Sequence, residues 1–362
     1  MKKVLFIDRD STILAEPANG LADTVEEFRF LPGVITALSR IARETDYELV
    51  MVTNQDGLGT ESFPEEMFWP SHNKMLQILS DEGIEFAEVF IDRTMPEENS
   101  PTRKPGTAML TKYLSQGIDL DSSYVIGDRV TDLQLACNLG CRALFISDEP
   151  NPLAAFNSPD WNDIYNFLKS IPRTARIVRR TKETSVELEL NLDGTGKGSI
   201  STGIGFFDHM LDQIPKHGGF DLTIKATGDL NVDPHHTVED VAIALGEGFS
   251  SAAGSKKGIE RYGFLLPMDD SLAQAAIDFG GRPWLVWDVR FVHNMIGDIP
   301  SEMFFHFFKS FSDNAKCNLN IKAEGENDHH RVEAIFKAFA KALRMALKMT
   351  DNYNLPSTKG TL

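Results

Sequence analysis

Two histidine pairs, each followed by a glutamate, stand in the C-terminal half of the chain as HHTVE (235–239) and HHRVE (329–333). On a helix, residues four apart share a face, whereas adjacent residues point about 100° apart. The first histidine and the glutamate of each motif can therefore bind one ion, and the second histidine points toward another. Imidazole and carboxylate ligands without a thiolate suit Mn, Fe or Zn.

One more histidine precedes each pair, His209 in FFDHMLDQ and His306 in FFHFFKSF. This internal repeat predicts a duplicated β/α unit, which would build a two-fold symmetric site. The complete set divides into four ligands for each of two ions, and Mn²⁺ fits such a mixed shell best. The predicted ligands are His209, His235, His236, Glu239, His306, His329, His330 and Glu333. A protein cage with structural or storage metal sites is the competing hypothesis, although structural zinc sites usually contain cysteine.

In the N-terminal half, carboxylates follow a short apolar run. VLFI (4–7) leads directly into Asp8 and Asp10 of a D-x-D-x-T pattern. Open parallel sheets bind ligands at the carboxyl ends of their strands. The pattern alone is weak, and it gains weight from polar residues at other predicted strand ends and loops. These are Thr53 in MVTNQDG, Lys104 in RKPG and Asp128 in VIGDRVTD.

The elements that must position these residues differ between the two halves. Short β-rich runs alternate with helical patterns up to about residue 146, which predicts a Rossmann-like parallel α/β sheet. Alternating strands such as 184–192 and 220–228, with amphipathic helices between them, predict an α+β domain after Pro172. The length of 362 residues also favours two domains, predicted at 1–171 and 172–362.

Composition limits the class of protein. Three cysteines argue against a disulfide framework and for a reducing cytoplasm. No apolar run approaches the roughly 20 residues of a membrane helix. A net charge of −17 argues against nucleic acid or an anionic membrane as partner. An anionic small-molecule substrate would need locally concentrated Arg and Lys.

The C-terminal motifs DHMLDQ, KHGGF, HHTVED, GRP, DHHRVEA and PSTKG resemble imidazoleglycerol-phosphate dehydratase, over about 176–362. The resemblance implies dehydration of D-erythro-imidazole-glycerol phosphate to imidazole-acetol phosphate in histidine biosynthesis. It also implies two Mn²⁺ per site at subunit interfaces of a homo-oligomeric cage, commonly of 24 subunits. Glu183 is the implied proton-transfer residue. Implied substrate contacts are Gln213, His217, Asp269 and Lys337, and the implied phosphate pocket consists of Arg261, Arg282, Ser357 and Lys359.

The N-terminal motifs FIDRD, TNQDGLGT, RKP and YVIGDR resemble haloacid-dehalogenase-like phosphatases, and among them histidinol-phosphatase. The resemblance implies that Asp8 is a nucleophile that forms an aspartyl-phosphate and that Asp10 is the general acid and base. Mg²⁺ would be held by Asp8, the carbonyl of Asp10 and Asp128, supported by Asp132. The implied phosphoryl-binding residues are Thr53, Asn54 and Lys104.

The two resemblances together imply a bifunctional lyase and hydrolase of histidine biosynthesis, acting on two phosphate monoesters, one of them L-histidinol phosphate. The alternative is a dehydratase with an inactive or differently directed phosphatase half. Two departures bear on this choice. Asp92, Thr94, Ser100 and Thr102 stand where related phosphatases often carry a Cys-x-His…Cys-x-Cys zinc loop, so no structural zinc is expected. Ser11 replaces the usual glycine of D-x-D-G-T.

Overall fold

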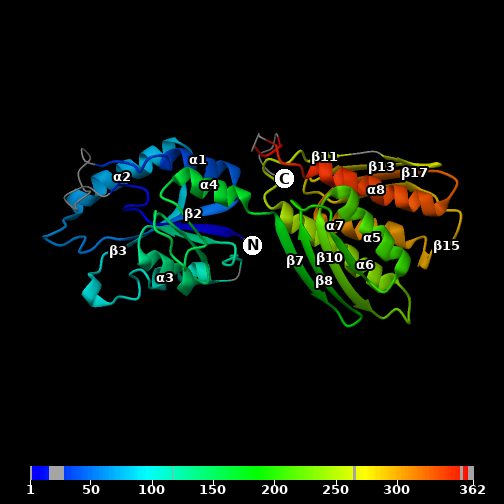
Figure 1. Cartoon of the computed structure of the whole chain (residues 1–362), viewed down its shortest axis with the longest axis horizontal. Coiled ribbons are helices and arrows are strands. Elements are labelled where there is room, and N and C mark those ends of the chain that lie inside the picture. Colours follow the sequence, from blue (N-terminus) through cyan, green and yellow to red (C-terminus); the bar gives the residue numbers. More distant parts are fainter. Residues whose placement is uncertain (1, 16–27, 116, 264–265, 351–353, 358–362) are drawn as a thin grey trace. The chain divides into compact units, whose positions relative to one another are not determined.

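The structure, a computed structural model, describes residues 2–15, 28–115, 117–263, 266–350 and 354–357. The chain separates into two compact units, 1–171 and 172–362 (Figure 1). No helix in these described ranges combines the length and the apolar character needed to cross a membrane.

The N-terminal unit is built around a parallel sheet whose described strands are ordered β3-β2-β1-β4-β5-β6. The strands are β1 Lys3–Ile7, β2 Tyr47–Asn54, β3 Phe86–Asp92, β4 Tyr124–Gly127, β5 Arg142–Phe145 and β6 Phe156–Asn157. The helices are α1 Val34–Glu44, α2 Glu65–Asp81, α3 Val130–Leu139 and α4 Trp161–Ser170. Alternate residues of β1 enter different hydrophobic clusters, Leu5 and Ile7 on one face and Val4 and Phe6 on the other. Both faces of the sheet are therefore buried, as the predicted Rossmann-like fold requires.

Strand order determines where polar residues meet in this unit. β1 pairs in parallel with both β2 and β4, with Ile7 opposite Met51 and Ile126. The carboxyl ends of these three strands consequently lie at one edge, at the point where the strand order reverses. Asp8, Thr53 and Asp128 stand at those ends.

The C-terminal unit contains two sheets, ordered β7-β8-β10-β9 and β11-β13-β17-β14 over the described residues, with β12 paired to β13. Its helices pack between the sheets, and all contribute to one hydrophobic cluster (Figure 1). The first half of the unit comprises β7 Thr174–Arg180, β8 Thr184–Asn191, β9 Gly198–Ser201, α5 Gly205–Gly218, β10 Asp221–Gly228 and α6 His235–Ala253. The second comprises β11 Tyr262–Gly263, β12 Leu266–Met268, β13 Ser271–Asp278, β14 Trp284–Val289, β15 Met295–Ile296, β16 Ile299–Pro300, α7 Met303–Ala315, β17 Asn318–Glu324 and α8 Asp328–Ala346.

The predicted duplication is visible in this topology. β10 pairs antiparallel with β8 and parallel with β9, and β17 repeats this arrangement with β13 and β14. The helices pack across the repeat, because α5 lies against α8 and α7 lies against α6. This crossed packing determines which histidines meet.

Candidate active sites

A buried lysine links two carboxylates at the sheet edge of the N-terminal unit. Lys104 Nζ lies 2.7 Å from Asp8 Oδ1 and 2.7 Å from Asp132 Oδ1. Asp8 is 6% exposed, Lys104 4% and Asp132 1%. The backbone N–H of Arg9 also donates to Asp8 Oδ1 at 2.7 Å. The Asp8 carboxylate is thus held at the end of β1 by two donors on one oxygen.

Asp10 is held by two residues that the sequence reasoning did not select. Arg9 Nη1 lies 2.5 Å from Asp10 Oδ1, and Gln55 Nε2 donates to Asp10 Oδ2 at 2.6 Å. Burial raises the pKa of Asp10 above its usual value, although the Arg9 charge acts in the opposite direction. A raised pKa suits a carboxyl group that must give up a proton to a leaving group. Gln55 lies in the TNQDGLGT motif, and its place in that motif is the feature of the sequence that could have indicated a role at this site.

A cavity of about 180 Å³ opens over these residues. Its lining consists of Asp8, Asp10, Asn54, Arg103, Lys104, Arg129, Val130 and Thr131. Asn54 also holds the Lys104 backbone, since Lys104 N–H donates to Asn54 Oδ1 at 3.0 Å. Thr53, by contrast, is 1% exposed, and its hydroxyl accepts from Gln55 Nε2 at 2.9 Å. It is not among the residues that line the cavity.

The carboxylates of this site fit a hard divalent cation. Oxygens of Asp8, Asp128 and Asp132 lie within 4.8 Å of one another. Burial raises the pKa of Asp128 to about 6, and the charges of Asp8 and Asp132 add to the effect. A bound cation would offset this mutual repulsion, and oxygen ligands are those that Mg²⁺ prefers.

The unusual Ser11 adopts the left-handed conformation, with φ of 53°. A glycine is favoured at such a position, and a residue with a side chain pays about 1 kcal/mol there. The D-x-D-x-T loop therefore keeps its turn with a serine in place of glycine.

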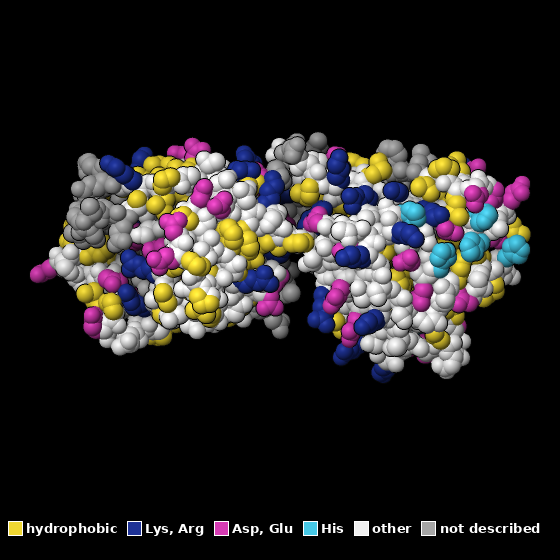
Figure 2. All heavy atoms as spheres, in the orientation of Figure 1, with side chains coloured by type: hydrophobic (Ala, Val, Ile, Leu, Met, Phe, Trp, Pro, Cys, Tyr) yellow, Lys and Arg dark blue, Asp and Glu magenta, His cyan; other side chains and the backbone are white. Residues whose placement is uncertain are grey.

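In the C-terminal unit, ligand atoms of His209, His329 and Glu333 lie within 4.8 Å of one another. Glu333 Oε2 is 3.5 Å from His329 Nε2 and 3.9 Å from His209 Nε2. His209 lies on α5 and the other two on α8, so this cluster joins the two copies of the repeat. Figure 2 shows histidine side chains gathered in one region of this unit's surface.

The matching cluster joins α6 and α7. His235 Nε2 lies 3.6 Å from Glu239 Oε2, and the His235 and His306 rings are 5.0 Å apart between centroids. The α5–α8 cluster thus brings together three of the predicted ligands, whereas the sequence predicted four per ion. In the α6–α7 cluster, His235 lies near both Glu239 and His306. The remaining ones, His236 and His330, point elsewhere, as their i+1 position requires.

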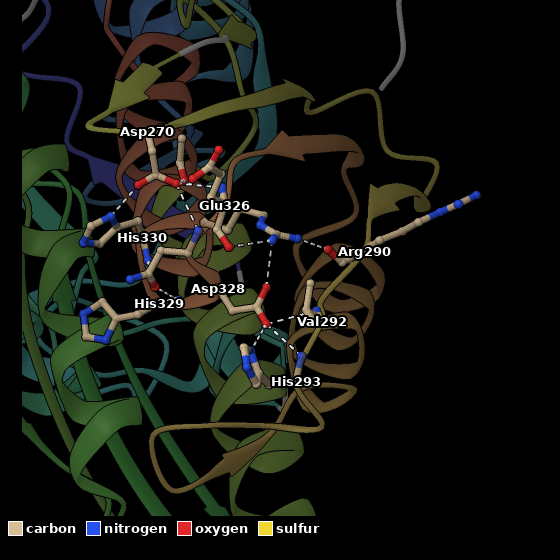
Figure 3. A network of polar contacts seen from close by, with 11 residues as sticks. Asp270, Arg290, Val292, His293, Glu326, Asp328, His329 and His330 are labelled. Atoms are coloured by element: carbon tan, nitrogen blue, oxygen red, sulfur yellow. Dashed lines mark hydrogen bonds and ion pairs between the residues drawn. The ribbon is translucent and has the colours of Figure 1, made fainter.

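Carboxylates orient these second histidines. Asp270 Oδ1 lies 2.6 Å from His330 Nδ1 (Figure 3). Asp229 Oδ2 lies 3.1 Å from His236 Nδ1. These hydrogen bonds raise the pKa of both imidazoles. Binding Nδ1–H to a carboxylate presents Nε2 to a metal ion, which is a common arrangement around histidine ligands. The donor chemistry therefore fits a metal at both positions.

Local hydrogen bonds fix the start of each metal-binding helix. Asp233 accepts from the His235 N–H, and Asn327 accepts from the His329 N–H, both at 2.8 Å. Asp328, the buried first residue of α8, also accepts from the N–H groups of Val292 and His293 and from His293 Nδ1 (Figure 3). The loop 290–293 is thereby tied to the helix that carries His329 and His330.

Most predicted substrate contacts surround the α5–α8 cluster. Lys337 Nζ lies 2.8 Å from Glu333 Oε1, one turn along α8. Burial by itself would raise the pKa of Glu333, but Lys337 brings it below its usual value. On α5, Gln213 Oε1 lies 3.2 Å from His217 Nε2, and Gln213 Nε2 donates to the His209 carbonyl at 3.0 Å.

In the described part of the chain, neither Glu183 nor Asp269 makes a side-chain hydrogen bond to the α5–α8 or the α6–α7 cluster. Glu183 is exposed between β7 and β8, and its N–H donates to Thr181 Oγ1 at 3.2 Å. Its charge contributes to the raised pKa of His236, after the Asp229 contact. Asp269 has φ of 45° and stands beside Asp270, the residue that contacts His330. Neither Asp229 nor Asp270 was predicted from the sequence. Asp229 lies 7 residues from His236 and Asp270 lies 60 residues from His330, so no common spacing marks the two carboxylates.

The predicted phosphate pocket lies at the carboxyl end of β13, opposite the end at which Asp270 contacts His330. A cavity of about 330 Å³ is lined by Asp278, Gly280, Arg282, Pro283, Trp284 and Asn318. Arg261 pairs with Asp278, with Nε 2.5 Å from Oδ1, and donates from Nη1 to the Pro356 carbonyl at 2.7 Å. Ser357 follows Pro356 directly, and Lys359 lies outside the described residues.

Comparisons with known proteins bear on both units. The family model for imidazoleglycerol-phosphate dehydratase matches residues 202–343, and the HAD-hydrolase-like model matches 101–157. The histidine biosynthesis bifunctional protein HisB of Spirosoma linguale is 56% identical over 383 residues, covering both chains completely. Its counterpart in Bacteroides fragilis is 57% identical over 372 residues, again with complete coverage of both. The chain belongs to the family of bifunctional histidine biosynthesis proteins.

Among solved structures, imidazoleglycerol-phosphate dehydratase from Staphylococcus aureus is 34% identical, with a TM-score of 0.45, and covers 49% of this chain and 99% of its own. Membership of the bifunctional family makes the chain an enzyme of histidine biosynthesis with a lyase half and a hydrolase half. Both component families are metal-dependent. The candidate metal positions are the carboxylates of Asp8, Asp128 and Asp132 and the α5–α8 cluster of His209, His329 and Glu333.

Proposed function

We propose that residues 172–362 dehydrate D-erythro-imidazole-glycerol phosphate to imidazole-acetol phosphate with Mn²⁺, and that residues 1–171 hydrolyse L-histidinol phosphate with Mg²⁺. The dehydratase proposal rests on the paired His/Glu clusters with carboxylate-oriented second histidines. The phosphatase proposal rests on Asp8 and Asp10 at a buried Lys104. Both substrates are small phosphate monoesters, which agrees with the cationic residues concentrated at each site despite the net charge of −17.

In the dehydratase, the chain must bind an imidazole at one end and a phosphate at the other. When bound, the Mn²⁺ ions would polarise the substrate imidazole and make the proton on the adjacent carbon more acidic. Glu183 is the proposed residue for proton transfer, because it is exposed beside His236. Gln213, His217 and Lys337 would orient the substrate next to Glu333. Arg261 and Arg282 would hold the phosphate, which guanidinium groups bind well.

The distance between the two ends of the proposed site supports an assembly of several chains. Asp270 stands just before β13 and contacts His330, whereas Asp278 at the end of β13 lines the phosphate cavity. An extended strand of this length separates them by roughly 25 Å. That distance exceeds the span of a three-carbon phosphate ester carrying an imidazole. We therefore propose a homo-oligomer, with 24 subunits as the expected number, in which neighbours complete the metal shell and the phosphate pocket.

In the phosphatase, the contacts to Asp8 Oδ1 leave Oδ2 as the attacking atom. Asp8 Oδ2 forms a bond to phosphorus as the ester P–O bond breaks, and protonated Asp10 gives its proton to the departing alkoxide. Asp10, now a carboxylate, takes a proton from the water that attacks the aspartyl-phosphate. The products are L-histidinol and phosphate, with Asp8 restored. Lys104 compensates charge on the phosphoryl oxygens, and Mg²⁺ when bound would supply further positive charge there.

Both activities can be assayed on the full chain, supplied with Mg²⁺ and Mn²⁺. Asp8→Asn should lower phosphate release from L-histidinol phosphate by more than about a thousandfold, because it removes the nucleophile, and should leave dehydration unchanged. His329→Ala should do the reverse. Asp148→Asn, an exposed aspartate outside the cavity lining, is the matched control. Dehydration without phosphate release in the unmodified chain would reduce the proposal to a dehydratase with an inactive or differently directed phosphatase half.

A further inference from the structure

A buried carboxylate closes the loop that follows β3. Asp92, the last residue of β3, is 3% exposed. Its Oδ1 accepts from the N–H of Thr94 at 2.9 Å and from the Thr94 hydroxyl at 2.5 Å. Its Oδ2 accepts from the hydroxyl of Thr102, ten residues further along, at 2.5 Å. Three donors therefore compensate for burial of the charge.

A fourth side chain extends this cluster. Ser100 Oγ and Thr102 Oγ1 lie 2.6 Å apart. A hydroxyl has one proton, and Thr102 gives its proton to Asp92, so Ser100 must be the donor to Thr102. We call Asp92, Thr94, Ser100 and Thr102 the hydroxyl clasp. Its side chains offer only oxygen atoms, with neither the thiolates nor the imidazoles that zinc sites use.

The clasp ends immediately before two residues that line the phosphatase cavity. Arg103 follows Thr102 and pairs through Nη1 with Asp56 Oδ1 at 2.5 Å, and it also donates to the Thr94 carbonyl at 2.9 Å. Lys104 comes next, and its ammonium group contacts Asp8 and Asp132. A shift in the position of Thr102 would therefore also displace Lys104, two residues further along, whose ammonium group contacts the proposed nucleophile Asp8.

We propose that the hydroxyl clasp is a metal-free positioning device that holds Arg103 and Lys104 at the phosphatase cavity and thereby sets the affinity for the phosphate ester. The proposal rests on the phosphatase function proposed above. Within the clasp, Thr102 acts through Arg103 and Lys104 and does not itself line the cavity. Its hydroxyl joins the far end of the loop directly to the last residue of β3.

Two substitutions at one position separate the hydroxyl from the volume of the side chain. Thr102→Val keeps the shape and removes the hydroxyl, whereas Thr102→Ser keeps the hydroxyl. The valine variant leaves buried Asp92 short of a donor, which should raise the KM for L-histidinol phosphate about tenfold, with a smaller change in kcat. The serine variant should stay within about twofold of the unmodified chain, because the hydrogen bond is retained. The thermal unfolding transition that Mg²⁺ shifts reports whether the N-terminal unit of each variant is folded.

Limited trypsin digestion tests the clasp without using catalysis. Fragments ending at Arg93 or Arg103, identified by mass spectrometry, should form faster in the valine variant only. Treatment of the unmodified chain with a zinc chelator, followed by Mg²⁺, should leave that rate unchanged. A valine variant with unmodified KM and cleavage rate would overturn the proposal, as would chelator-induced cleavage reversed by zinc. Faster cleavage of the valine variant, in a chain that hydrolyses no L-histidinol phosphate, would support the clasp and refute the phosphatase function.

Discussion

At the scale of single residues, the two histidines of each pair are held differently. The first faces a glutamate one turn along its helix, at 3.5 Å for His329 and 3.6 Å for His235. The second is anchored through Nδ1 by Asp270 or Asp229. Adjacent residues can thus serve two different ions, because one helix step turns their side chains apart and separate carboxylates fix each direction.

Asp270→Asn should weaken Mn²⁺ binding 10- to 100-fold, because an amide no longer favours the Nδ1–H tautomer that presents Nε2. The asparagine keeps an acceptor for the Glu326 and Asn327 N–H groups that Asp270 also binds. Isothermal titration of metal-free protein with Mn²⁺ would measure the change. Asp288→Asn, an exposed position on β14, is the control. Equal affinity in both variants would mean that Asp270 does not orient a ligand.

At the scale of elements, helix α2 carries a histidine into the core of the N-terminal unit. His72 is 1% exposed, its ring stacks on Phe68 at 4.8 Å between centroids, and its Nδ1 has no hydrogen-bond partner within the described structure. Burial lowers the pKa of His72 to about 4, and the charge of Arg9 adds to this effect. His72 therefore packs as part of the core of this unit.

The low pKa of His72 should make the N-terminal unit sensitive to acid. The His72 imidazole has a pKa of about 6.5 in the unfolded chain and about 4 in the folded chain, so between these values the unfolded chain binds more protons. The contribution of neutral His72 to the free energy of unfolding is therefore fully present above pH 6.5 and is lost as the pH falls toward 4. His72→Phe should remove this part of the pH dependence without orphaning a hydrogen bond. Thermal unfolding between pH 7 and 4.5 measures it, using the transition that Mg²⁺ shifts. An unchanged slope in the variant would contradict the assignment.

At the scale of the whole molecule, the proposed dehydratase site would take its two ends from different chains. The proposed metal ligand His330 and the proposed phosphate pocket lie at opposite ends of β13, and the α5–α8 cluster brings together three of the proposed ligands within one described chain. The second histidines are already oriented for ions outside these clusters. A neighbour that supplied them would complete both metal shells.

Mixed oligomers should therefore recover activity that neither parent has. His329→Ala removes a metal ligand, and Arg282→Ala removes a phosphate contact, so each should lower dehydration at least about a hundredfold. Co-expression should restore a substantial fraction of activity, because some sites then take both intact halves from different subunits. Each variant co-expressed with itself is the control. Mixed particles, verified by two affinity tags, that remain inactive would show that the site lies within one chain.

Much of this enzyme could be predicted from residue types and local spacing. The parallel sheet was predicted from short apolar runs, and the duplication was predicted from repeated motifs. Both patterns are local, because each is contained in a short stretch of adjacent residues. The carboxylates of Asp8 and Asp10 could be placed at a strand end for the same reason.

Tertiary structure decided which distant residues meet. Along the chain, His209 stands nearest to His235, yet the crossed packing of α5 on α8 brings it to His329. Asp270 reaches His330 only because β13 and α8 pack together, and Asp92 reaches Thr102 only because a loop closes. Local periodicity determines which face a side chain occupies, but contacts between elements depend on strand order and helix packing, which no short stretch of sequence contains.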